Sequence, residues 1–275
     1  MALRRQDISV LLLYYFGYSK IRNFAYRLQR TPLARFVTFH DIMPESVICF
    51  ERNLLFLKKR TNVVSLDDFF KGRLSSEKIN VVITFDDGYK GWISYAIPAL
   101  KRFKLPAVFF VSSGFVGLSK EEEEEYMQLK LFRKMLRHRT TGGLSHVDLR
   151  RIIEEGFIVG GHTLNHCNIS EINDISLLGY EIIEDKKRLE TVTESAVDYF
   201  AYPSGDYQNP FIDSTELLIE AGYKGAVTTV PGFNRIGTNP YLLNRDLTSS
   251  SMPWRTFRAR VYGNFDAIRF IKRLL

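Results

Sequence analysis

The sequence has few cysteines, no low-complexity linker and no apolar run long enough to cross a membrane. Its two cysteines, Cys49 and Cys167, exclude a disulfide framework and match no thiolate metal site. No stretch rich in proline, glycine and serine divides the 275 residues, so separate domains joined by a linker are not expected. A hydrophobic content of 45% supplies one large core and excludes a disordered or fibrous chain.

Positive charge is concentrated at the start of the chain. Residues 1–35 hold seven basic residues against one acid, Asp7, and carry +6 of the formal net charge of +7. Nucleic-acid-binding proteins more often place basic residues among their functional loops, so no nucleic-acid partner is expected. A basic, partly apolar helical segment suits either a solvated surface helix or a helix lying on an anionic membrane surface.

The apolar run at residues 8–16 is too short to span a membrane, which requires roughly 20 apolar residues. It follows Arg4 and Arg5 as the apolar region of a signal peptide would, but no small-residue cleavage site comes after it. We therefore predict no cleavable signal peptide and a cytoplasmic location, with residues 1–35 as the segment that could contact a membrane.

Short β-rich runs alternate with helical patterns along residues 36–275, as in repeated βα units. Strands are predicted at residues 36–39, 62–64, 81–85, 107–112, 157–159, 199–202 and 225–229. Helices are predicted near residues 47–57, 89–104, 145–155, 174–190 and 211–221. The predicted fold class is α/β, a distorted (β/α) barrel of about seven parallel strands in a single domain.

Residues 118–143 interrupt this alternation. An acidic run at 121–125 precedes basic residues between 130 and 139, a charge order that suits a helix dipole. We interpret the segment as an insertion, either a solvated surface helix or a lid over a substrate groove. Ser145 and Asp148 then form the pattern of a capping box, at which the regular alternation resumes.

Reactive side chains directly follow several predicted strands. They are His40, Asp41, Asp86, Asp87, His162 and His166. In a parallel βα fold the ends of neighbouring strands converge on one face. Two histidines spaced His-x-x-x-His and one carboxylate form a common ligand set for a catalytic zinc, with one coordination position left open. The pattern therefore predicts a metal site in which Asp86 or Asp87 supplies the carboxylate.

Three stretches of the chain carry a resemblance to a known family. They are Thr84-Phe85-Asp86-Asp87-Gly88, Pro106-Ala107-Val108-Phe109-Phe110-Val111 and His162-Thr163-Leu164-Asn165-His166. Together they resemble carbohydrate esterase family 4, the NodB-type polysaccharide deacetylases, over about residues 81–229. The resemblance implies metal-dependent removal of acetyl groups from N-acetylated, sometimes O-acetylated, glycans on a distorted (β/α) barrel.

The same resemblance implies roles for individual residues. Asp86 would be the general base, and Asp87, His162 and His166 would hold one divalent metal ion. Zinc suits these ligands best, and nickel, cobalt or iron could occupy the same site. The oxyanion of the reaction would be held by the metal and by a backbone N–H in the loop formed by Tyr202, Pro203 and Ser204.

The chain departs from the family pattern at two positions. No histidine follows His166, where most members carry the histidine that acts as general acid, and Ala201 stands where the third motif has an arginine. Residues 36–44 are similar to the N-terminal strand motif of a circularly permuted branch that includes the biofilm poly-N-acetylglucosamine deacetylases. That similarity implies His40 as the acid. The alternatives are that His40 is a core or turn residue, or that His138 or His146 is the acid.

Arg245 could stand in for the missing arginine. Paired with Asp86, it would favour the charged form of the base. A salt bridge to Asp246 or a surface position is an equal alternative.

The function predicted from these residues is that of a metal-dependent hydrolase that removes acetyl groups from N-acetylhexosamine units of a glycan or glycan precursor. One alternative is a deacylase of another amide or of an O-acetyl ester. The other is a catalytically silent glycan-binding protein with the same fold. The joint presence of Asp86 and the three expected metal ligands disfavours this last alternative, because a binding module needs neither.

Overall fold

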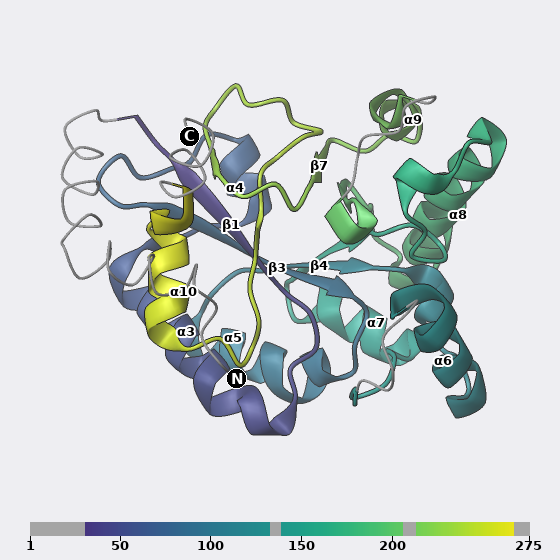
Figure 1. The fold of residues 1–275 in the computed structure, drawn as a ribbon, viewed down its shortest axis with the longest axis horizontal. Coiled ribbons are helices and arrows are strands. Elements are labelled where there is room, and N and C mark those ends of the chain that lie inside the picture. The colour runs from purple at the N-terminus through teal and green to yellow at the C-terminus, as the bar shows by residue number, and fades with distance from the viewer. Residues whose placement is uncertain (1–30, 133–138, 206–212, 267–275) are drawn as a thin grey trace, which may run out of the picture.

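The computed structural model describes residues 31–132, 139–205 and 213–266 (Figure 1). The predicted N-terminal helical segment falls almost entirely at residues 1–30, and it lies outside the described part of the chain together with His138. Within the described ranges, no helix combines the length and the apolar character that crossing a membrane would require.

Parallel strands form the central sheet, and every strand predicted from the sequence is present. They are β1 (Ala34–Phe39), β2 (Asn62–Val63), β3 (Asn80–Asp87), β4 (Val108–Val111), β5 (Ile158–Gly161), β6 (Tyr199–Ala201) and β7 (Gly225–Val227). Their spatial order is β7-β6-β5-β4-β3-β1, and β2 pairs with the start of β3. All these neighbours are parallel, which confirms the predicted α/β barrel as a curled, partly open one.

Helices surround this sheet in Figure 1. They are α3 (Val47–Arg60), α4 (Leu66–Phe70), α5 (Ile97–Phe103), α6 (Lys120–Tyr126), α7 (His146–Glu154), α8 (Ile175–Thr193), α9 (Ser214–Glu220) and α10 (Trp254–Val261). Short 3-10 turns lie at Pro44–Ser46, Ser113–Phe115, Ile169–Glu171 and Pro203–Gly205, and π-helical turns lie at Trp92–Ala96 and Met127–Leu131. The capping box predicted at Ser145 and Asp148 begins α7, and α6 begins with another at Ser119 and Glu122.

The two faces of the strands pack against different neighbours. Val37, Ile83 and other outward side chains belong to the core between sheet and helices, whereas Phe36 and Val82 belong to a smaller cluster inside the barrel. Because side chains alternate along a strand, Asp86 lies on the same face as Val82. The inner face thus changes from apolar to acidic toward the end of β3.

A short segment bridges the two sides of the open barrel. Leu243 pairs with Val227 of β7, and β9 (Asp246–Leu247) pairs in parallel with β1. Another short strand, β8 (Phe233–Asn234), runs antiparallel to the start of β1. Arg245 lies in the bridging segment, immediately before β9, and is carried into the barrel interior by this connection.

Glycine at position 160 allows β5 to lie close to its neighbours. A Cβ atom there would be 2.4 Å from the Phe110 ring and 2.8 Å from the carbonyl oxygen of Tyr199. We expect Gly160→Ala to lower the free energy of unfolding by about 1–3 kcal/mol through overpacking. Urea denaturation of the purified protein measures this change.

Gly179 provides the matched control, because it lies within α8 and a Cβ atom there would meet nothing within 4 Å. Gly179→Ala should raise the free energy of unfolding by about 0.5–1 kcal/mol, since alanine loses less backbone entropy than glycine in a helix. Equal stabilities of the Gly160→Ala variant and the wild type would contradict the close packing of β4, β5 and β6.

Candidate active site

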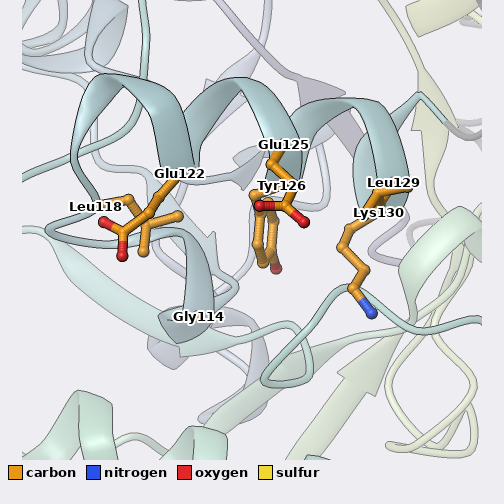
Figure 2. A pocket seen from close by; sticks show the side chains of 7 residues that line it. All are labelled: Gly114, Leu118, Glu122, Glu125, Tyr126, Leu129 and Lys130. Atoms are coloured by element: carbon orange, nitrogen blue, oxygen red, sulfur yellow. The ribbon is translucent and has the colours of Figure 1, made fainter.

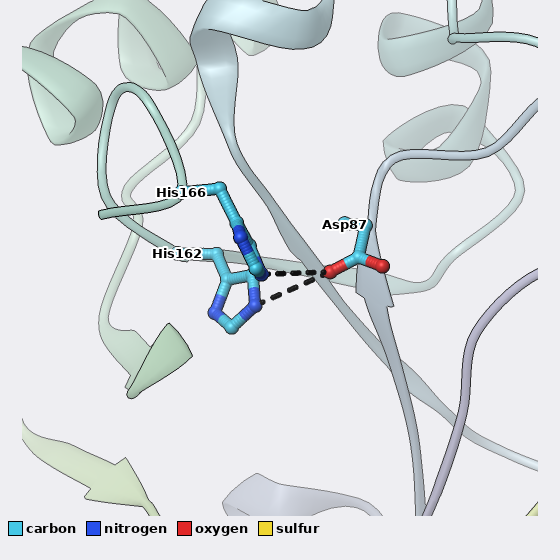
Figure 3. Close-up of side chains that lie close together, drawn as sticks. All are labelled: Asp87, His162 and His166. Atoms are coloured by element: carbon cyan, nitrogen blue, oxygen red, sulfur yellow. Dashed lines mark ion pairs between the residues drawn. The ribbon is translucent and has the colours of Figure 1, made fainter. Parts of the chain in front are cut away.

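The three predicted metal ligands meet at the ends of β3 and β5. The Asp87 Oδ1 atom lies 3.4 Å from Nε2 of His162 and 3.3 Å from Nε2 of His166. Both imidazole rings face the Asp87 carboxylate (Figure 3). Asp87 and His162 are buried, and His166 is partly buried. Of the two carboxylates left open by the sequence, Asp87 is therefore the one that joins the histidines.

These atoms fit a cation placed among them. The Nδ1 atom of His162 lies 2.6 Å from the carbonyl oxygen of Ala201, to which it can only donate, so a neutral ring presents the Nε2 lone pair to Asp87. A lone pair facing a carboxylate oxygen is repulsive unless a positive charge lies between them. The ligand spacing also matches the edge of a zinc tetrahedron, about 3.3 Å for bonds of about 2.0–2.1 Å.

Unusual backbone angles turn these ligands toward one another. Strand alternation alone would place Asp86 and Asp87 on opposite faces of the sheet. Asp87 has a φ angle of 90°, which breaks the alternation and allows both carboxylates to line one cleft. His166 has a φ of 51°, in the left-handed region that few non-glycine residues occupy. Such backbone strain is common at functional sites.

Charges in the site favour an ionised Asp87. Burial opposes its ionisation, yet the pKa of Asp87 lies well below its usual value, because the His162 and His166 rings donate hydrogen bonds to it when their Nε2 atoms carry protons and nearby His40 adds positive charge. A cation in the site would take the place of those protons. Burial and the nearby Asp87 carboxylate raise the pKa of Tyr89 well above that of a free tyrosine. Tyr89 therefore lines the cleft as a neutral phenol.

Arg245 pairs with Asp86. Its Nη1 atom lies 2.6 Å from Oδ1 of Asp86, and both side chains are buried. Arg245 also donates to the carbonyl oxygen of Thr228 through Nε. Asp246 is engaged instead by Arg35, at 2.5 Å. Of the three alternatives drawn from the sequence, the structure thus selects the pair with Asp86 over a bridge to Asp246 or a surface position.

His40 lines the same cleft as the three metal ligands. The indole N–H of Trp92 donates to the His40 carbonyl oxygen at 2.9 Å and fixes the backbone of this residue. The carboxylate of the adjacent Asp41 accepts hydrogen bonds from the backbone N–H and the hydroxyl of Thr141. His146, the first residue of α7, lies beside Gly117 and is not among the described residues that line the cleft.

The cleft has a volume of about 640 Å³ and is partly built by the predicted insertion. Besides Asp87, His162 and His166, the cleft is lined by four residues of the insertion, Leu131, Phe132, Arg139 and Thr140. Thr141 anchors the end of the insertion by donating to Asp41 and accepting from the backbone N–H of Gly91. The insertion is therefore more than a solvated surface helix, because its two described ends form a wall of the cleft.

Of the three residues predicted to form the oxyanion loop, the structure places Ser204 at the cleft. The backbone N–H of Tyr202 donates to the carbonyl oxygen of Val227 within the sheet, and Pro203 has no N–H. Ser204 lines the cleft with a φ angle of 57°. Of the three residues, Ser204 is thus the one whose N–H is free of the sheet pairing and whose position faces the site.

A smaller pocket of about 190 Å³ lies beside α6 (Figure 2). It is lined by Gly114, Leu118, Glu122, Glu125, Tyr126, Leu129 and Lys130. No residue that lines this pocket also lines the cleft, so the pocket is separate from the cleft that holds the reactive groups.

Two buried acids of α8 were not anticipated from the sequence. Asp185 accepts a hydrogen bond from the backbone N–H of His162, and Glu181 accepts one from the backbone N–H of Asn165. Both fall on the helix face that also buries Leu178 and Ile182. An acid at a core position of an amphipathic helix was the signal that could have revealed them.

Comparisons with known proteins identify the family of the chain. Residues 74–226 match the polysaccharide deacetylase family. YxkH of Bacillus subtilis, a protein assigned to the polysaccharide deacetylases, is 26% identical over 186 residues. These residues are 68% of this chain and 57% of YxkH, so the chain spans little more than half the length of this curated relative.

Solved structures share the fold at low sequence identity. PplD, a Streptococcus pyogenes deacetylase solved in complex with acetate, has a TM-score of 0.66 and 19% identity, covering 84% of this chain and 99% of PplD. IcaB from Ammonifex degensii has a TM-score of 0.64 and 23% identity, covering 83% of this chain and 97% of IcaB. The family match spans more than half of the chain and contains Asp86, Asp87, His162 and His166. The chain therefore belongs to the polysaccharide deacetylase family, as its motifs predicted.

Proposed function

We propose that this protein is a metal-dependent hydrolase that removes acetyl groups from N-acetylhexosamine units of a glycan or glycan precursor. The observation that carries the proposal is that a carboxylate oxygen of Asp87 and an imidazole nitrogen from each of two histidines converge. They do so beside the second carboxylate, Asp86, which is paired with Arg245. The solved complex of PplD with acetate, the product of such a reaction, supports it.

In this proposal, Asp87, His162 and His166 hold one divalent cation, most readily zinc. When bound, the cation supplies positive charge that polarises the acetyl carbonyl and favours loss of a proton from water. Asp86 accepts that proton as water attacks the carbonyl carbon, and Arg245 holds the carboxylate in place through their ion pair. The backbone N–H of Ser204 faces the developing negative charge on the carbonyl oxygen.

The second half of the reaction needs a proton for the leaving nitrogen. Breaking the C–N bond releases acetate and a free amine, and an unprotonated amide nitrogen is a very poor leaving group. His40 is the one remaining histidine among the described residues that line the cleft besides the two ligands. We assign it as the general acid that protonates this nitrogen.

Metal content tests the proposal directly. We expect the wild type to bind one equivalent of metal by elemental analysis and to release acetate from an N-acetylglucosamine oligomer in a metal-dependent way. His162→Ala should lose both, because two ligands hold a cation far less tightly than three. A wild type without metal and without acetate release would overturn the proposal and favour a silent binding protein. Metal binding with acetate release only from O-acetyl esters would favour the alternative substrate class.

The acid role of His40 predicts a difference between substrates. His40→Ala should retain metal but lose most hydrolysis of an unactivated N-acetyl amide. Hydrolysis of an activated acetyl ester should fall much less, because its leaving group needs no proton. Steady-state kinetics on both substrates measure the difference, with His146→Ala as a control outside the cleft. Equal losses on the two substrates would argue against proton donation.

The pair of Arg245 with Asp86 predicts coupled losses of stability and activity. Arg245→Met leaves a buried carboxylate without its partner, which should lower the free energy of unfolding by about 3–5 kcal/mol. Acetate release should fall while metal content is kept. Arg235→Met, at an exposed arginine, is the control for both measurements. Undiminished acetate release from Arg245→Met would show that Asp86 needs no arginine to act as base.

A further inference from the structure

Helix α8 presents two buried carboxylates to the loop that carries the histidine ligands. Glu181 and Asp185 lie one helical turn apart, with exposures of 6% and 0%. Neither forms an ion pair with a lysine or arginine among the residues that the structure describes. Burying two acids on one helix face is costly unless each is fully hydrogen-bonded, so their partners indicate what they do.

Asp185 binds the backbone at the start of this loop. Its Oδ2 atom accepts from the N–H of His162 and its Oδ1 atom accepts from the N–H of Ser113, each at 2.8 Å. One carboxylate thereby joins the residue after β5 to the residue that begins the 3-10 turn after β4. The N–H of Gly114 also donates to the carbonyl oxygen of Leu164, which ties the same two loops together.

Glu181 binds the second half of the loop. Its Oε2 atom accepts from the N–H of Asn165 at 2.8 Å, and its Oε1 atom accepts from the Asn165 side-chain amide at 2.7 Å. The backbone carbonyl of Glu181 in turn accepts from the N–H of Leu164. The loop from His162 to His166 is thus held by α8 at three backbone N–H groups, those of His162, Leu164 and Asn165.

The close approach of α8 depends on Gly161. A Cβ atom at this position would be 3.1 Å from Oδ2 of Asp185 and 2.2 Å from the hydroxyl of Tyr223. The absence of a side chain at the end of β5 therefore brings the backbone of His162 within hydrogen-bond reach of the helix. This is a physical reason for the glycine that precedes the first histidine ligand.

We infer that Asp185 and Glu181 are positioning residues for the metal site, which fix His162 and His166 in the geometry that binds a cation. The inference rests on the proposed metal-dependent function. Groups behind metal ligands usually orient them through the imidazole ring, as the Ala201 carbonyl does for His162. The two carboxylates instead act through the backbone, because they accept hydrogen bonds from the N–H groups of His162 and Asn165.

The test measures metal affinity apart from catalysis. Purified wild type, Asp185→Asn and Glu181→Gln are stripped of metal and titrated with Zn²⁺ against a competing chelator, and their unfolding without metal is followed by urea denaturation. We expect both variants to bind Zn²⁺ about 10–100-fold more weakly than the wild type. The visible absorption of the Co²⁺-substituted proteins should change as well, because the ligand geometry is altered.

Glu184→Gln is the matched control, since Glu184 lies on the same helix and pairs with Arg188 outside the loop contacts. Its Zn²⁺ affinity should equal that of the wild type. Variants that unfold more easily without metal yet bind Zn²⁺ with unchanged affinity would overturn the inference and leave a structural role. If Asp185→Asn does not fold, Glu181→Gln decides between these outcomes. A wild type that binds no Zn²⁺ would refute the proposed function itself.

Discussion

The buried pair of Arg245 and Asp86 links the closure of the barrel to the chemistry of the cleft. Arg245 comes from the segment that pairs with both β7 and β1, and it reaches across the interior to the end of β3. A buried arginine without a carboxylate would be costly, as would a buried carboxylate without an arginine. The position of the bridging segment and the charge of Asp86 therefore depend on each other.

Much of the fold and part of the site could be predicted because their signals are local. Each parallel strand appears as a short apolar run, and the His-x-x-x-His spacing lies within a single loop after β5. The contact between Arg245 and Asp86 joins residues far apart in the sequence, so the sequence alone left three alternatives for this arginine. The roles proposed for Asp185 and Glu181 could not be predicted either. The periodicity of a helix shows which of its residues are buried, but not which loop they contact.

The insertion shows how a surface segment can form part of the wall of the candidate active site. Its charge pattern predicted a helix at the surface, and α6 begins with a capping box in the acidic run. What charge and periodicity could not predict is the anchor at Thr141, whose partner Asp41 directly follows His40. Through this anchor, the wall formed by Phe132 and Arg139 is tied to the loop that carries the proposed acid.

Two adjacent carboxylates acquire different chemistry from their surroundings alone. Asp86 follows the side-chain alternation of β3, points into the barrel and pairs with the guanidinium group of Arg245. Asp87, with its φ of 90°, leaves that alternation and meets two imidazoles whose Nε2 atoms need a positive charge between them and the carboxylate. Since Asp86 is already paired with Arg245, a divalent cation in the proposed function would be held chiefly by Asp87 and the two histidines. The neighbouring Asp86 carboxylate would then stay free of the metal and able to accept a proton.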